Sequence, residues 1–168
     1  VAVAKAVAHE GLAVDACSEG ELRTALAAGV PGSRIGMHGN NKSNAELRYG
    51  IESGVGRIIV DSLDEIGRLE QILQDTDRTV SVLVRVTTGV EAHTHDYIAT
   101  AHEDQKFGFS ILGGQALMAL VRCLQSPRLE LVGIHSHIGS QIFDTSAFEV
   151  AARRTMRLMN QFRQATGT

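Results

Sequence analysis

The sequence has 168 residues, of which 43% are hydrophobic and 21% charged, and its formal net charge is −3. That length is enough for one core and short of two comfortable domains, and the composition is that of an ordinary globular protein. No Lys/Arg run forms a basic patch, which argues against nucleic acid and membrane partners, and no apolar stretch approaches the ~18 residues of a membrane span.

Two cysteines and the first residues indicate the compartment. Cys17 and Cys123 stand alone in apolar segments, without a C-x-x-C pair. We therefore expect two buried, reduced thiols, as in cytosolic proteins, with a disulfide between them as the alternative. No basic and apolar leader pattern precedes the first predicted element, so we expect a cytoplasmic protein.

Short, β-branched and nearly continuous apolar runs recur along the chain, as expected of strands buried on both faces. They predict strands over residues 12–17, 34–39, 57–62, 81–87 and 129–138. The interval between the last two is long enough for one further unit, with a short strand at 106–110. About six strands are therefore predicted.

Helices are predicted before, between and after these strands. Ser43 and Ser62 are the expected N-caps of two of them, each with a glutamate three residues on, Glu46 or Glu65. A strand followed by a capped helix is the repeating unit of a parallel sheet. The predicted helices are one at the start of the chain, which includes Lys5, and those over residues 18–29, 43–54, 62–74, 110–125 and 146–164.

The predicted strands have two distinct faces, because strand residues alternate sides. One phase is apolar: Leu12, Val14, Ala16, Ile35, Met37, Ile58, Val60, Val82, Val84, Val86, Val132, Ile134 and Ile138. The opposite phase carries charged groups and imidazoles near the strands' C-terminal ends: Asp15, His38, Asp61, Arg85, His135 and His137.

This pattern favours an α/β fold in the form of a partial (β/α)8 TIM barrel of roughly six to seven βα units. In such a barrel the apolar phase faces the helices, and the C-terminal ends of the strands form the mouth of the active site. A doubly wound open sheet is the alternative, since it also gathers ligands at strand C-termini. Taken singly, Asp61 is better explained as a helix cap and His38 as a satisfied core histidine, and only the convergence of several such residues favours a site.

Two βα turns suit the binding of a ligand. In "HIGSQ", Gly139 and Ser140 offer free backbone amides and a hydroxyl near a helix start, which suits a phosphate; a plain turn explains them equally well. In "MHGNNKSNAEL", Asn40 and Lys42 are candidates to line the mouth, and a polar turn is again the alternative.

Histidines also raise the question of a metal. His93, His95, Asp96 and His102 lie in a long polar loop over 87–105 that reads as functional or mobile. His135 and His137 have the H-x-H spacing of a zinc pair, but barrel hydrolases place such a pair on the first strand. We expect no metal at either place.

Six stretches, in this order, resemble the fold-type III, alanine-racemase-like family of pyridoxal-phosphate decarboxylases: "VDACSEGEL", "HGNNKS", "VDSLDEI", "VLVRV", "HEDQKFGFS" and "GIHSHIGSQIFD". The sequences of the second and last of these, and of "VEAHTHDYIATAHEDQKFGFS", are similar to those of the diaminopimelate decarboxylases within that family. The resemblance implies pyridoxal 5'-phosphate as cofactor.

The resemblance also implies roles for single residues. Asp15 matches an aspartate near the cofactor's lysine linkage, and Arg85 matches a strand arginine on the same side. His137 matches the imidazole that stacks on the pyridine ring, and Ser140, beside Gly139, matches a hydroxyl that holds the phosphate. No role is implied for His135.

Several features of the family have no match in these 168 residues. The Schiff-base lysine of the family lies on a strand before the matching region, and Lys5 falls in the helix that follows it. The glycine-rich phosphate loop and a second, β-rich domain have no counterpart here. We expect residues 1–168 to be an internal fragment, a partial barrel domain without the first strand and the last barrel strand or strands, and inactive alone.

For the complete enzyme the resemblance implies decarboxylation of meso-2,6-diaminopimelate to L-lysine and CO2, the last step of lysine biosynthesis, by a homodimer. Three alternatives stay open. They are another decarboxylase of the family acting on ornithine or arginine, a non-catalytic cofactor-binding barrel protein, and a metal-dependent barrel hydrolase.

Overall fold

The computed structural model describes residues 1–90, 106–140, 142–143 and 145–168. The strands in this part of the chain are β1 (Val14–Ala16), β2 (Ile35–Met37), β3 (Arg57–Val60), β4 (Val80–Thr87), β5 (Phe109–Ser110) and β6 (Leu129–Ser136). The α-helices are α1 (Ala2–His9), α2 (Glu19–Ala27), α3 (Asn44–Glu52), α4 (Leu63–Leu73), α5 (Gln115–Gln125) and α6 (Ser146–Thr166), with a 3-10 helix at Gly32–Arg34.

All the described strand pairs are parallel, and β1, β2, β3 and β4 are neighbours in chain order. β6 pairs with the other edge of β4, which continues the same order. In a doubly wound sheet the order of the strands reverses at a switch point, and the strand order of this sheet does not reverse. The fold is therefore a partial TIM barrel, as predicted.

The strand predicted at 106–110 exists, but it is not one of the strands that form the barrel wall, which we call staves. Val86 pairs with Phe109 of β5 and with Ser136 of β6, so these two strands lie on opposite edges of β4. β5 thus pairs with the same edge of β4 as β3 does, but nearer the C-terminal end of β4. Among the described residues the barrel wall has five staves, β1, β2, β3, β4 and β6, rather than the six or seven units expected.

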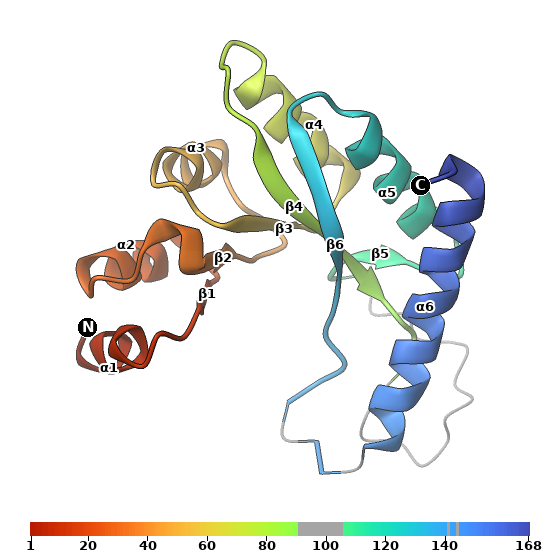
Figure 1. The fold of residues 1–168 in the computed structure, drawn as a ribbon, viewed down its shortest axis with the longest axis horizontal. Helices are drawn as coiled ribbons and strands as arrows, with labels where there is room; N and C mark the ends of the chain where they lie inside the picture. The colour runs from red at the N-terminus through yellow and green to blue at the C-terminus, as the bar shows by residue number, and fades with distance from the viewer. Residues whose placement is uncertain (91–105, 141, 144) are drawn as a thin grey trace.

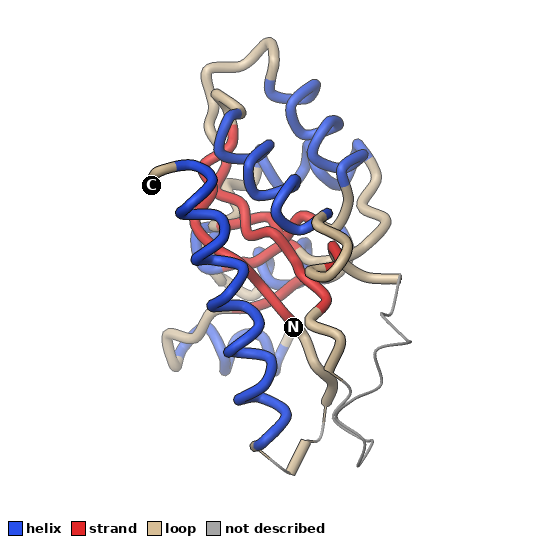
Figure 2. Tube along the Cα trace, turned by 90° about the vertical axis from the view of Figure 1, so that its right-hand side faces the viewer, coloured by secondary structure: helices blue, strands red, loops and turns tan. Residues whose placement is uncertain are grey.

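Helices α2 to α6 lie along the outer, convex side of the curved sheet, and the concave side stays open (Figure 1). The core fills the space between them with the predicted apolar phase, including Met37, Ile58, Val60, Val82 and Val84. The long helix α6 runs beside the strands and packs through Leu158 (Figure 2). The concave side carries the opposite phase and therefore positions the candidate site.

A β-bulge in β6 corrects the predicted alternation. Val82 pairs with Leu131 and Leu83 pairs with Gly133, so Val132 is an extra residue and is 49% exposed. Before the bulge, Leu131 faces the core instead of Val132. The bulge shifts the phase by one residue, so that Ile134 faces the core and the histidines after it face inward. Leu12, also assigned to the apolar phase, precedes β1 and is 57% exposed.

The helix caps are largely as predicted. The Ser43 hydroxyl accepts a hydrogen bond from the Glu46 N–H, and the Glu46 carboxylate accepts one from the Ser43 N–H, which completes a capping box. Ser62 caps α4 by accepting from the Glu65 N–H. The Glu65 carboxylate turns away from Ser62, accepts from the Asp61 N–H and does not complete a second box.

The two thiols differ in environment. Cys123 is buried, and burial raises the pKa of its thiol to about 12. The expectation of a buried Cys17 is wrong, because this residue follows a short strand at the rim and is exposed. Both cysteines are free. No helix in the described ranges is long and apolar enough to cross a membrane.

Candidate functional site

The candidate site lies on the concave side of the sheet, at the C-terminal ends of the staves. Parallel register brings the predicted inward residues to one edge, because each lies near or just after the C-terminal end of its strand. Arg85 and His135 stand opposite each other in the β4–β6 ladder, and Asp15 lies opposite Gly36 in the β1–β2 ladder. The inward phase thus forms one polar cluster rather than scattered surface residues.

Asp15, His38 and His135 form a row across this cluster. Nε2 of His38 lies 3.2 Å from Oδ1 of Asp15, and the rings of His38 and His135 meet edge to face with centroids 5.0 Å apart. Burial lowers the pKa of both imidazoles, that of His135 to about 4, with His38 and Arg85 adding to the effect on His135. Both rings are therefore neutral at pH 7.

Arg85 is held on two sides. Its Nε lies 3.8 Å from Oδ1 of Asp61, and its guanidinium stacks 4.4 Å from the centre of the Phe107 ring. Oδ2 of Asp61 accepts a hydrogen bond of 3.0 Å from the Gly108 N–H. Asp61 therefore binds both Arg85 and the segment before β5, which excludes the alternative that it merely caps α4.

A cavity of about 260 Å³ lies beside Arg85. It brings together Arg85, Phe107, His137 and Gly139, four residues from β4, from the segment before β5 and from the turn after β6. Gly139 has a φ of 132°, which other residues rarely adopt, and Ser140 beside it is exposed. The exposed imidazole of His137 offers a flat surface at the same cavity.

The structure thus places the predicted residues in two groups. Arg85, His137 and Gly139 share the cavity, with Ser140 next to it in the chain. Asp15 does not line this cavity and lies in the row with His38. The chemistry of the cavity residues suits a flat ring bearing an anionic group, since an imidazole face, a cation, a free amide region and a hydroxyl are present.

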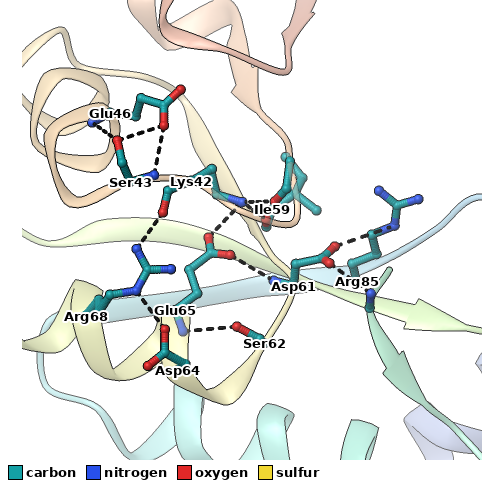
Figure 3. Close-up of polar contacts among 12 residues, drawn as sticks. Lys42, Ser43, Glu46, Ile59, Asp61, Ser62, Asp64, Glu65, Arg68 and Arg85 are labelled. Carbon is teal, nitrogen blue, oxygen red and sulfur yellow. Dashed lines mark hydrogen bonds and ion pairs between the residues drawn. The ribbon is translucent and has the colours of Figure 1, made fainter. Parts of the chain in front are cut away.

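Lys42 does not line the mouth, contrary to expectation. Its side chain is 2% exposed, and Nζ forms an ion pair of 2.8 Å with Oε1 of Glu65 and donates to the Ile59 carbonyl (Figure 3). Lys42 is long enough to reach across the turn into the gap between α3 and α4, where Glu65 needs a counter-charge. Asn40 is exposed, and its side-chain amide donates to the Lys106 carbonyl, which joins the β2–α3 turn to the segment before β5.

Lys42 and Glu65 belong to a network of polar contacts that leads through Asp61 to Arg85 of the site. Glu65 accepts from the Asp61 N–H, and Asp61 in turn approaches Arg85 (Figure 3). Burial raises the pKa of Glu65, and the charge of Lys42 opposes that effect. Arg68 of α4 donates to the Lys42 carbonyl and closes the network on the outside.

Sequence reasoning found the members of the site but not its contacts. The Asp15–His38 and Asp61–Arg85 pairs depend on register between strands, and Phe107 was missed because β5 was expected to be a stave. His93, His95, Asp96 and His102 lie outside the described residues. Within the described ranges, no three His, Cys, Asp or Glu side chains form a metal-binding group.

The chain matches the model of one protein family over residues 1–168, described as the pyridoxal-binding domain of the pyridoxal-dependent decarboxylases. It is 54% identical over 157 residues to a diaminopimelate decarboxylase of Mycobacterium leprae, covering 94% of this chain and 33% of the relative. It is 48% identical over 165 residues to that of Bacillus subtilis, covering 98% and 38%.

Solved structures agree with this similarity. A diaminopimelate decarboxylase from M. jannaschii superposes with a TM-score of 0.88 at 31% identity, over 98% of this chain and 38% of that one. The enzyme from Helicobacter pylori complexed with L-lysine has a TM-score of 0.86 at 29% identity, over 99% and 41%. The chain spans about a third of the length of the curated relatives that it matches.

Proposed function

We propose, since this chain belongs to the pyridoxal-dependent decarboxylase family through its pyridoxal-binding domain, that it is part of a diaminopimelate decarboxylase. The proposed reaction removes CO2 from the D-configured end of meso-2,6-diaminopimelate and yields L-lysine. The observation that supports it most is the identity of about half of all residues to diaminopimelate decarboxylases over nearly the whole chain.

The cavity residues fit pyridoxal phosphate. His137 presents an exposed imidazole face for the pyridine ring, and Ser140 with the Gly139 turn offers donors to the phosphate. Arg85 supplies a positive charge in the same cavity, and Asp15 supplies a carboxylate from the facing row. The bound cofactor provides an electron sink for the carbon–carbon bond that breaks.

The protein's part in this reaction is orientation. The exposed imidazole of His137 would hold the pyridine ring by a flat contact and so orient the bond that breaks. Asp61 holds Arg85 at 3.8 Å and keeps the guanidinium on the Phe107 face rather than free to rotate. The Ser140 hydroxyl would hold the phosphate at the other end of the ligand, which would leave little freedom for misalignment.

The rest of the assembly is also part of the proposal. Because the chain spans about a third of its relatives, we place the Schiff-base lysine, the glycine-rich phosphate loop, the remaining barrel strands and a β-rich domain outside these 168 residues. We further propose a cytoplasmic homodimer in which the partial barrel over residues 1–168 is one region.

The test is turnover by the full-length protein loaded with pyridoxal phosphate. It should release lysine from meso-diaminopimelate faster than it decarboxylates ornithine or arginine. Faster turnover of ornithine or arginine assigns another decarboxylase of the family. Cofactor binding without any turnover assigns a non-catalytic barrel protein, and metal-dependent hydrolysis without the cofactor assigns a hydrolase.

A matched pair of variants tests the site. Ser140→Ala should weaken pyridoxal phosphate binding by about 10- to 100-fold, because a hydrogen bond to a charged group contributes ~1.5–3 kcal/mol. His9→Ala, which removes an imidazole that is 89% exposed at the end of α1, serves as the control and should bind as wild type does. Equal affinity in both variants would remove Ser140 from the site.

A further inference from the structure

Gly36 stands directly opposite Asp15 in the parallel ladder of β1 and β2. His38 lies two residues further along, on the same face of the sheet, at a diagonal distance that long side chains can span. A Cβ atom at position 36 would lie 2.8 Å from Oδ1 of Asp15. The carboxylate therefore lies over the bare backbone of Gly36, and only glycine leaves it that space.

His38 fixes the carboxylate through the same oxygen, Oδ1. The backbone N–H of His38 donates to the Ala16 carbonyl at 2.8 Å. This bond extends the β1–β2 ladder and anchors His38 beside β1. Nε2 then meets Oδ1 of Asp15 at 3.2 Å. Because the ring is neutral, this contact requires the tautomer that carries its proton on Nε2.

His135 supports His38 from the opposite wall of the barrel. It lies on β6, opposite Arg85, and its ring meets that of His38 at an angle of 73°. Its Nδ1 is buried and has no hydrogen-bond partner among the described residues. An apolar residue would pack there without leaving a polar atom unsatisfied, so packing alone does not account for a histidine.

The Asp15–His38 contact is poorly suited to stabilising the fold. The Asp15 side chain is 74% exposed, and ion pairs at such exposure contribute little to folding. What the contact does restrict is the rotamer of Asp15. A carboxylate that is exposed to the concave side but fixed in direction is suited to meet a ligand there.

We propose that His38 is a positioning residue that fixes the Asp15 carboxylate toward the bound cofactor, with Gly36 providing the space and His135 supporting the imidazole. This rests on the proposed function, which places Asp15 in the cofactor site. His38 acts only through Asp15 and contacts no reacting atom. The row thus gives His38, just after β2, and His135 of β6 a shared role separate from the stacking role of His137.

The test uses the full-length protein and measures the dissociation constant for pyridoxal phosphate, together with kcat and KM. His38→Phe keeps a ring of similar size against His135 but loses the donor, whereas His38→Gln keeps an N–H donor at similar reach. His38→Phe should weaken cofactor binding and lower kcat by roughly 10- to 100-fold, with KM little changed. His38→Gln should retain most of both.

Gly36→Ala tests the same carboxylate without touching the histidine. The new methyl group must displace Asp15, so this variant should reproduce the loss seen in His38→Phe. In an Asp15→Ala background, His38→Phe should change the dissociation constant by less than about twofold, because its effect passes through Asp15. Thermal unfolding of each variant identifies any that fail to fold, and the Gly36 variant then decides.

Two results would overturn the proposal. One is full cofactor affinity and kcat in folded His38→Phe or Gly36→Ala protein. The other is a loss in the Asp15→Ala background as large as in the wild type, which would mean that His38 acts independently. Failure of the proposed function looks different, because the wild-type protein itself would then neither bind pyridoxal phosphate nor release CO2.

Discussion

Buried imidazoles give the mouth of the barrel its character at the scale of single residues. His38 and His135 lie among Asp15, Arg85 and His137, and burial outweighs the attraction of the one carboxylate. They are therefore neutral side chains that can donate from one nitrogen and accept at the other. The two histidines can therefore orient an anionic ligand through hydrogen bonds without carrying a charge. The formal positive charge in this cluster is that of Arg85.

The low pKa of His135 predicts a loss of stability in mild acid. The folded protein holds this imidazole neutral down to about pH 4, whereas the unfolded chain protonates it near 6.5, so unfolding takes up a proton between these values. Stability is complete above pH 6.5 and falls as the pH drops toward 4. The contribution is at most about 3 kcal/mol.

Urea unfolding of the cofactor-free, full-length protein at a series of pH values measures this effect. His135→Phe cannot titrate and should lose less stability between pH 6.5 and 4 than the wild type, although its absolute stability differs. His9→Phe, at an exposed position, should keep the wild-type slope. Parallel curves for wild type and His135→Phe would contradict the prediction.

The identity of the site residues was predictable, but their partners were not. Strand alternation placed Asp15, His38 and Arg85 on one face, because that depends only on position within a strand. Whether a side chain points along the mouth or down into a helix gap depends on its neighbours. Lys42 shows this, since it was expected to line the mouth and instead forms an ion pair with Glu65 on α4.

At the scale of elements, the Lys42–Glu65 pair joins the turn after β2 to helix α4. Both side chains are almost fully buried, at 2% and 1% exposure, and Glu65 also accepts from the backbone of Asp61. The position of Asp61, and through it that of Arg85, is thereby tied to two βα turns. An ion pair in such a place is better understood as fixing geometry than as adding stability.

This predicts an asymmetry between single and double substitutions. Lys42→Met leaves Glu65 buried without its counter-charge and should cost about 3–5 kcal/mol of unfolding free energy. Lys42→Met with Glu65→Leu removes both charges and should recover most of that loss. The double variant should still bind pyridoxal phosphate more weakly, because Asp61 loses the bond from its N–H to Glu65.

Urea denaturation and cofactor titration of the three proteins measure the two effects separately. Glu149→Gln is the matched control, since it breaks an exposed pair with Arg153 on α6 and should change stability by less than ~1 kcal/mol. A double variant as unstable as Lys42→Met would show that the charges themselves are required. Wild-type cofactor affinity in the double variant would separate the pair from the site.

The elements themselves were predicted well where the signal is local. Ser43 and Ser62 cap their helices as expected, because a hydroxyl three residues before a free N–H is a local arrangement. The bulge at Val132 and the edge position of β5 were not predictable, because both depend on which strand lies alongside. Alternation counted through the bulge therefore assigned Val132 to the wrong face.

At the scale of the whole molecule, the sheet is curved but not closed. β1 pairs with β2 alone and β6 with β4 alone in the part of the chain that the structure describes, so each has one edge without a strand partner there. Figure 1 shows these two ends of the sheet separated by the open concave side. Unpaired strand edges readily pair with those of other molecules.

We therefore expect the 168 residues, produced alone, to associate and to lack decarboxylase activity. Val132 is the bulge residue of β6 and is 49% exposed, so Val132→Lys should place a charge beside that edge and reduce association. Met118→Lys changes an apolar residue that is 54% exposed but lies on helix α5 rather than on a strand, and should help less.

Sedimentation and light scattering over a range of concentrations measure this. A monomeric isolated chain with a sharp, concentration-independent melt would show that the open edges are tolerated. Equal improvement by the two lysine variants would attribute the effect to added charge in general rather than to the edge. Greater improvement by Val132→Lys would identify β6 as the edge at which another part of the protein must pair to close the barrel, since the site residues His135 and His137 lie on and just after that strand.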